Sequence, residues 1–173
     1  MKILEIKNLS LKSKKSNVLL LKNISLTLNK GETLGIVGES GSGKTLTGLS
    51  VTGLLDSSIF EIISGEVIYG KRNLLACPEE YLRSIRTKKI SMIFQEPMLS
   101  LNPVQTIKKQ LDEVIKLHVT KIQKDIDSLS KEIIIKTGLE DVAKTLSSYP
   151  HMLSGGQRQR VMIAIALVCK PDI

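Results

Sequence analysis

Aromatic residues are the scarcest feature of this 173-residue sequence. They account for 3% of it, as three Tyr and two Phe, and there is no Trp. A hydrophobic core must therefore consist of Leu, Ile and Val, for which the hydrophobic content of 42% is sufficient. The scarcity also argues against a surface that binds single-stranded nucleic acid, because such surfaces stack bases on aromatic rings.

Cysteines and long apolar segments are also few. Cys77 and Cys169 lack the spacing of a metal or redox pair, which favours two free thiols in a reducing compartment. The longest uninterrupted apolar run, Val161–Cys169, is far shorter than the roughly 18 residues that cross a bilayer. The N-terminal MKILEIKNLS alternates in polarity, unlike a secretory signal. We therefore expect a soluble, cytoplasmic chain.

The net charge of +8 comes mostly from Lys residues scattered along the chain. No basic stripe is interleaved with aromatics, so the charge predicts a solvated surface and no nucleic-acid partner. The same charge would favour anionic ligands or an anionic membrane surface.

Periodicity predicts several strands before any helical region. Alternating polarity predicts half-buried antiparallel strands at Ile3–Lys7 and Ile24–Leu28, and an apolar run predicts a buried strand at Thr33–Val37. Short strands are also expected at Gly65–Tyr69 and Ile90–Phe94.

The remainder of the chain has helical spacing. Apolar residues recur every three or four positions in Val104–His118, Ile122–Thr137 and Leu139–Thr145, with Gly138 as a break. After Tyr149–Pro150, a last helix is expected from Ser154 to about Cys169.

The segment GESGSGKT follows the predicted strand Thr33–Val37 directly. Its glycines allow the backbone to curl around an anion, and the unpaired N–H groups at the following helix start attract phosphate. Lys44 opposes the helix dipole and is therefore better explained by a bound triphosphate, with the Thr45 hydroxyl directed to Mg²⁺. The alternative is a glycine-rich turn that caps a helix. The predicted nucleotide-binding residues are Gly38, Glu39, Ser40, Gly41, Ser42, Gly43, Lys44 and Thr45.

A second candidate site opens the last helix. Ser154 and Gln157 have the spacing of a capping box, which is the purely structural interpretation. That interpretation does not explain Gly155 and Gly156, because two glycines make a poor first helical turn. Glycines expose bare N–H groups, so these four residues are a candidate second phosphate site.

Together these motifs resemble the ATP-binding cassette (ABC) ATPases of membrane transporters. GESGSGKT matches the family's phosphate loop, Gln95 its Q-loop glutamine, and LSGGQRQR its signature. QEPMLSLNP and YPHMLSGGQRQRVMIAIAL resemble the oligopeptide, dipeptide and nickel importer branch. The resemblance covers essentially the whole chain.

The resemblance implies a fold and a domain division. The fold is α/β: a P-loop NTPase core with an antiparallel β layer and a helical subdomain, with the C-terminal part of the core missing. The implied division of this single incomplete domain is residues 1–97 for the core and β layer, 98–153 for the helical subdomain and 154–173 for the signature helix.

The resemblance also implies roles for the site residues. Lys44 and Thr45 would hold ATP and Mg²⁺, and Gln95 would approach the metal and the attacking water. Ser154, Gly155, Gly156 and Gln157 would contact the ATP of a second ATPase subunit. The other implied partners are transmembrane permease subunits and, indirectly, a solute-binding protein, at the cytoplasmic face of the membrane.

Two departures from the family pattern modify these expectations. No Tyr, Phe or Trp lies between Met1 and Phe60, where the family stacks adenine on an aromatic ring, and only Leu11 and Ser13 stand in that neighbourhood. The chain ends at Lys170–Pro171–Asp172–Ile173, before the family's Asp-Glu strand and switch histidine. We therefore expect the N-terminal part of a longer importer ATPase, which binds ATP but hydrolyses it poorly.

Two other functions remain open. The chain could be a non-catalytic nucleotide-binding partner in a heteromeric ATPase pair, whose signature serves the partner's site. It could also be a soluble ABC ATPase that acts on DNA or ribosomes, which the scattered charge disfavours.

Overall fold

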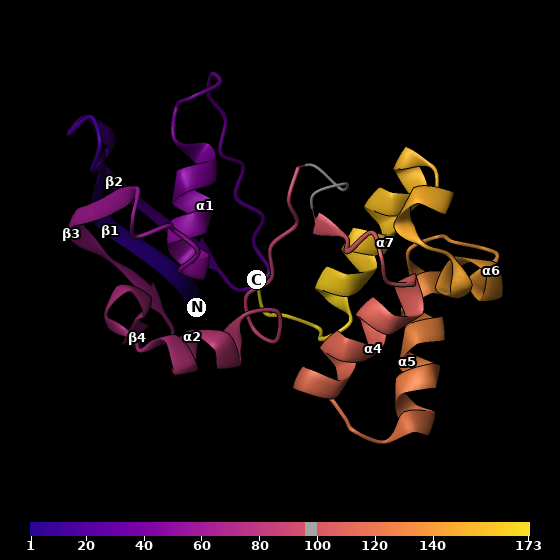
Figure 1. Ribbon diagram of the computed structural model, residues 1–173. Coiled ribbons are helices and arrows are strands. Elements are labelled where there is room, and N and C mark those ends of the chain that lie inside the picture. The colour runs from indigo at the N-terminus through magenta and orange to yellow at the C-terminus, as the bar shows by residue number, and fades with distance from the viewer. Residues whose placement is uncertain (96–99) are drawn as a thin grey trace. The chain divides into compact units, whose positions relative to one another are not determined.

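The computed structural model describes residues 1–95 and 100–173 and is shown in Figure 1. Contacts divide the chain into two compact units, Met1–Arg83 and Ser84–Ile173, each of which is described by itself. The predicted division at residues 97 and 98, and the middle of the QEPMLSLNP motif, fall on residues 96–99, outside the described residues. The three-part division therefore stays a prediction.

The first unit is built on an antiparallel sheet with the strand order β2-β1-β3-β4. The strands are β1 (Lys2–Ser13), β2 (Leu19–Asn29), β3 (Phe60–Tyr69) and β4 (Arg72–Asn73). Leu4, Ile6, Leu9 and Leu11 of β1 are buried and form the apolar side of the alternation. The predicted antiparallel strands are confirmed, and each extends further than the sequence indicated.

An irregularity interrupts the pairing of β1 with β3. The register shifts between Lys7 and Ser10, and Asn8 within that shift adopts a φ of 47°. The Asn8 backbone N–H donates to Ser25 Oγ at 2.9 Å, and the Ser25 hydroxyl donates to Asn8 Oδ1 at 3.2 Å. The register of β1 with β2 also shifts here, between Ile6 and Leu9, so the Ser25 side chain of β2 bonds Asn8 where the ladder is interrupted.

Two predicted strands are wrong. Thr33–Val37 forms no strand and is exposed, with Val37 94% accessible. A buried parallel strand needs neighbours on both sides, and no strand of the described residues pairs with this segment.

In Ile90–Phe94 only Ile90 makes a bridge, to Arg86. The next N–H, that of Ser91, donates to Ile173 O at 2.8 Å. Ile93 and Phe94 are about half exposed, and residues 91–94 belong to no strand, so the predicted strand is not formed.

Among the described residues of the second unit, the apolar faces of four helices meet in one core. They are α4 (Ile107–His118), α5 (Gln123–Lys136), α6 (Val142–Ser147) and α7 (Gly155–Leu167). The other helical elements of the described residues are α1 (Lys44–Thr52), η1 (Leu74–Ala76), α2 (Glu79–Ile85) and η2 (Pro150–Met152). The fully buried residues of this core are Ile107, Leu111, Ile115, Ile126, Ile134, Val161 and Ala164. The predicted helices are confirmed within a few residues of their bounds.

Side-chain caps account for the shifted helix starts. Thr106 accepts a bond from Lys109 N, so α4 begins three residues after the predicted Val104. Asp141 caps α6 in the same way through Lys144 N. Gly138 breaks the chain after α5 with a φ of 75°, as expected of a glycine after a helix. Among the described residues, no helix is long and apolar enough to cross a membrane.

A charged cluster links α4 to α5. The Lys108 ammonium donates to Asp112 Oδ2 at 2.6 Å and to Asp127 Oδ1 at 2.7 Å, and Ser130 donates to Asp112 Oδ1 at 3.2 Å. The hydrogen bond from Lys108, followed by that from Gln123, holds the pKa of Asp127 below its usual 3.8.

The charged cluster predicts a specific response to acid. Because folding lowers the pKa of Asp127, the Asp127 carboxylate adds to the free energy of unfolding above pH 4. This contribution is lost as the pH falls through the folded-state pKa. Asp127→Asn should therefore flatten the loss of stability below pH 4 in urea unfolding followed by circular dichroism. Asp125→Asn is the matched control, since Asp125 is exposed on the same helix. Equal acid profiles for wild type and Asp127→Asn would contradict the prediction.

Candidate functional site

The segment from Gly38 to Gly43 forms a loop that leads into α1. Gly41 and Gly43 have φ values of 83° and 92°, which L side chains rarely adopt. Gly43 is the N-cap of α1 and offers no side chain to the helix start. The first turn of α1 contains no acidic residue, so no carboxylate there compensates the positive end of the helix dipole.

Steric crowding favours glycine at Gly43 and, less strictly, at Gly38. A Cβ on Gly43 would lie 2.4 Å from Leu21 Cδ2 and 3.3 Å from Leu20 O, so the loop backbone lies directly against β2. A Cβ on Gly38 would lie 2.8 Å from Ser42 Oγ, which can rotate away, and a Cβ on Gly41 would meet nothing within 4 Å. The loop therefore lies close against β2 at Gly43, and the N–H groups at the start of α1 suit a polyanion.

The side chain of Lys44 turns back over this loop. Its ammonium donates to Gly38 O at 2.7 Å, to Glu39 O at 2.6 Å and to Ser42 Oγ at 3.3 Å. Lys44 thus places a cation at the helix end that already carries positive partial charge. Neither the ammonium nor the helix start has a carboxylate partner among the described residues, and two such positive features in one loop suit the phosphates of a nucleotide. Thr45 follows, with its side chain exposed in the first turn of α1.

The helix after the loop is shorter than its apolar spacing indicated. Leu46 and Leu49 lie in α1, but the helix stops at Gly53, which has a φ of 64°, so Leu54 lies outside it. Thr47, Ser50 and Thr52 are buried on α1 and donate their hydroxyls to carbonyls of the preceding turn. This buried face explains why a helix with so little apolar periodicity is stable.

The start of α7 contains the capping box that the sequence predicts. Ser154 Oγ accepts from Gln157 N at 3.3 Å, and Gln157 Oε1 accepts from Ser154 N at 2.9 Å. Gly155 and Gly156 are exposed, and a Cβ on either would meet nothing within 4 Å. Packing within the described residues therefore does not require these glycines, and their role in binding a phosphate stays a prediction.

The predicted site residues fall in both units. The loop residues Gly38–Thr45 come together in the first unit. Ser154–Gln157 come together in the second, and Gln95 lies at an exposed bend of the second unit, directly before the residues that are not described.

Among the described residues, no cluster of side chains forms a candidate metal centre of its own. No group of three or more His, Cys, Asp or Glu gathers in residues 1–95 or 100–173. The exposed Thr45 hydroxyl would suit Mg²⁺ that arrives with a nucleotide, because Mg²⁺ is usually held by substrate phosphates and only one or two protein oxygens.

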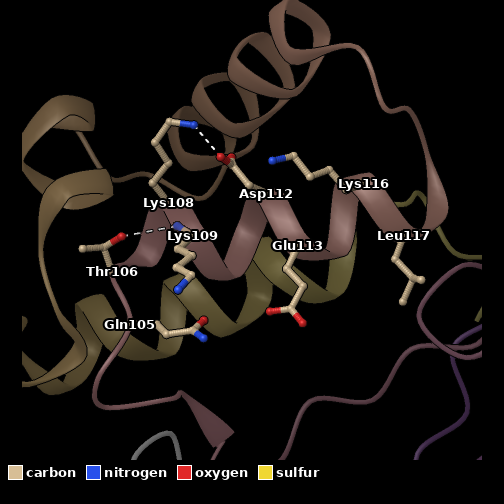
Figure 2. A pocket seen from close by; sticks show the side chains of 8 residues that line it. All are labelled: Gln105, Thr106, Lys108, Lys109, Asp112, Glu113, Lys116 and Leu117. Carbon is tan, nitrogen blue, oxygen red and sulfur yellow. Dashed lines mark hydrogen bonds and ion pairs between the residues drawn. The ribbon is translucent and has the colours of Figure 1, made fainter.

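Figure 2 shows a hollow on the surface of α4 that contains none of the predicted site residues. It is lined by Gln105, Thr106, Lys108, Lys109, Asp112, Glu113, Lys116 and Leu117. Lys108 is directed toward Asp112, and Thr106 toward the backbone of Lys109. Most of the charged groups are exposed or half-buried, so the hollow has the character of a solvated helix face.

Sequence reasoning missed two features of the site. It gave Lys44 no partners within the protein, although the ammonium contacts two carbonyls of its own loop. It also gave no role to Arg158, which donates to the carbonyl of Leu153, the first residue of the signature. The only available signal was that Arg158 lies within the signature LSGGQRQR.

The family model described as "ABC transporter" matches residues 21–173. The chain is 43% identical over 173 residues to an uncharacterized ABC transporter ATP-binding protein, YejF, of Escherichia coli. It is 42% identical over 173 residues to the oligopeptide transport ATP-binding protein AppD of Bacillus subtilis, and 43% identical over 158 residues to the glutathione import ATP-binding protein GsiA of Salmonella choleraesuis.

These matches include most of this chain but only part of each relative. The match to YejF covers 99% of this chain and 33% of YejF, and the match to AppD covers 99% of this chain and 53% of AppD. The match to GsiA covers 88% of this chain and 25% of GsiA.

The solved structures give the same fold. The dimeric bacterial ABC transporter cassette MJ0796 matches with a TM-score of 0.82 and 28% identity, over 98% of this chain and 71% of that one. A structure of MJ0796 bound to ADP and Pi matches with a TM-score of 0.83. The α/β P-loop fold is thus confirmed, and the chain belongs to the ABC transporter family.

Proposed function

We propose that this chain is the nucleotide-binding part of an ATPase that powers import of a peptide-type solute. The observation that carries the proposal is the cradle at Gly38–Thr45, where a helix N-terminus and the Lys44 ammonium have no compensating carboxylate among the described residues. ATP satisfies both, and the two solved MJ0796 structures, one with ADP and Pi, support the family relationship. Transport by the whole protein extends beyond this segment and rests on the likeness to AppD and GsiA.

Each predicted residue has a role in this proposal. The loop N–H groups and Lys44 bind the phosphates, and the Thr45 hydroxyl holds the Mg²⁺ that neutralises phosphate charge. Gln95 orients the attacking water, which a neutral amide can do through one donated and one accepted bond. Ser154, Gly155, Gly156 and Gln157 bind the terminal phosphate of the ATP that a second copy of the chain carries.

The partners and solute follow from the same relationship. Permease subunits would couple ATP binding at the cytoplasmic face of the membrane to movement of the solute. A solute-binding protein would deliver the solute to these subunits. AppD and GsiA are named for oligopeptide and glutathione transport, which favours a peptide-type solute. Nickel import and poor hydrolysis by these 173 residues stay predictions.

The first hairpin suggests how the nucleobase is held. Leu11, named from the sequence as a neighbour of the base, is fully buried in β1 and cannot contact it. Val18 and Leu19 are more than half exposed, and the next residue, Leu20, brings its carbonyl close to Gly43. We propose that the base rests on this aliphatic surface, which offers less stacking energy than an aromatic ring and little choice between purines.

A ligand series tests the proposed function. Isothermal titration with adenosine, AMP, ADP and ATP, each with Mg²⁺, should show affinity that rises with every added phosphate. Because the base makes mainly aliphatic contacts, GTP should bind within about tenfold of ATP, or about 1.4 kcal/mol. Inorganic tripolyphosphate serves as the control that isolates the cradle, and it should compete with ATP. Adenosine binding as tightly as ATP would remove the basis of the proposal.

A further inference from the structure

Arg158 holds the backbone on both sides of Ser154. Its Nη1 donates to Leu153 O at 2.8 Å and to Pro150 O at 3.5 Å. Its own backbone N–H donates to Ser154 O at 2.9 Å. The carbonyls that precede and follow the Ser154 Cα are therefore both bonded to one residue.

This arrangement is electrostatically unfavourable in the isolated chain. Arg158 brings a guanidinium back to the N-terminal end of α7, where the helix dipole is positive and the first turn contains no acidic residue. Its Nε is buried and has no hydrogen-bond partner among the described residues. Buried donors are nearly always paired, so an unpaired one calls for a compensating role.

The contacts of Arg158 restrict the residues that would meet a phosphate. Ser154 must keep its hydroxyl at the helix start for the capping box, while Gly155 and Gly156 have no side chains to hold their N–H groups in place. Buried Leu153 anchors the preceding peptide from the core side, and Arg158 anchors its carbonyl. The turn η2 is held as well, through Pro150 O.

We propose that Arg158 is a positioning residue for the signature. It fixes the peptides around Ser154, so that the Ser154 hydroxyl and the N–H groups of the two glycines point at the terminal phosphate of the ATP bound to a second copy of the chain. The negative charge of that phosphate in turn offsets the positive charge of Arg158. This inference rests on the proposed function, since it requires the ATP-bound pair.

The test separates positioning from stability. Three quantities are measured for wild type, Arg158→Gln and Arg158→Lys: ATP affinity by titration, melting temperature without nucleotide, and ATP·Mg²⁺-dependent self-association by sedimentation velocity. Lys136→Gln is the matched control, because it removes one positive charge from an exposed side chain of the same unit.

Arg158→Gln should weaken ATP-dependent self-association at least about tenfold while ATP affinity stays within about twofold of wild type. Arg158→Lys keeps the charge and one donor direction, so it should weaken ATP-dependent self-association by about threefold. This variant provides the measurement if Arg158→Gln does not fold. Lys136→Gln should behave as wild type.

The positioning role, but not the proposed function, would be overturned if folded Arg158→Gln self-associated at the wild-type level. Arg158→Lys takes its place in this comparison if the Gln variant does not fold. An equal loss in Lys136→Gln would also overturn it, since the effect would then be one of net charge. Wild type that binds no ATP, or binds it without self-association, would instead contradict the proposed function on which the inference rests.

Discussion

Lys44→Ala should weaken ATP·Mg²⁺ binding at least about 30-fold. The expected loss is about 2 kcal/mol or more, the usual cost of removing one partner from a close charge pair. The Lys44 ammonium already lies over the loop, bonded to Gly38 O and Glu39 O, so little reorganisation separates it from a phosphate bound in the same cradle. Titration calorimetry with ATP·Mg²⁺ measures the effect directly.

The same substitution should change stability much less than it changes binding. Removing a cation from a helix N-terminus is favourable by about 0.3–1 kcal/mol, which offsets part of the loss of two bonds to exposed loop carbonyls. The melting temperature without nucleotide should therefore remain close to that of wild type. Lys30→Ala, at an exposed turn of the same unit, is the control for loss of one positive charge. Binding by Lys44→Ala within about threefold of wild type would show that the loop does not hold the phosphates through this residue.

Gly65→Ala should destabilise the first unit by about 3 kcal/mol or more, from backbone strain and overpacking of about 1–3 kcal/mol each. Gly65 has a φ of 106°, and a Cβ there would lie 2.5 Å from Leu9 Cα and 2.7 Å from both Leu9 N and Lys7 O. These are backbone atoms of the neighbouring strand, so no side chain can rotate to make room. The Leu9 side chain is fully buried, which prevents the strand from moving away.

Gly70→Ala provides a matched control at the end of the same strand. Gly70 has a φ of 61°, and a Cβ there would meet nothing within 4 Å, so only the backbone preference is lost, at about 1 kcal/mol. Urea unfolding of both variants separates crowding from conformational preference. Equal losses of unfolding free energy in the two variants would mean that β1 shifts to accommodate the extra methyl group, which would contradict the prediction.

Local patterns in the sequence predicted the chemistry of the site and much of the fold. The spacing of Gly38, Gly43, Lys44 and Thr45 predicted a phosphate cradle, because the geometry depends on adjacent residues alone. The capping box at Ser154 was equally local, and the structure confirms both of its bonds. The helices around Gly138 followed from apolar spacing for the same reason.

Tertiary structure decided whatever depends on residues far apart in the chain. The apolar run Thr33–Val37 has the composition of a strand, yet a strand also needs partners, and none of the described residues pairs with it. The requirement for glycine at position 65 arises from Leu9, and that at position 43 from Leu20 and Leu21. The pairing of Arg158 with Leu153 O likewise depends on the direction its side chain takes in the folded unit.

The difference between what the sequence predicted and what the tertiary structure decided has one physical cause. Short-range order is set by backbone preference, caps and the periodicity of apolar residues, all of which can be seen in a few consecutive positions. Strand pairing, close backbone approach and side-chain reach are set by which distant segments meet, and many distant pairings satisfy the same local pattern. The amino-acid sequence by itself thus determined that this chain has a loop suited to phosphate, and only the folded chain determined which neighbours make its glycines necessary.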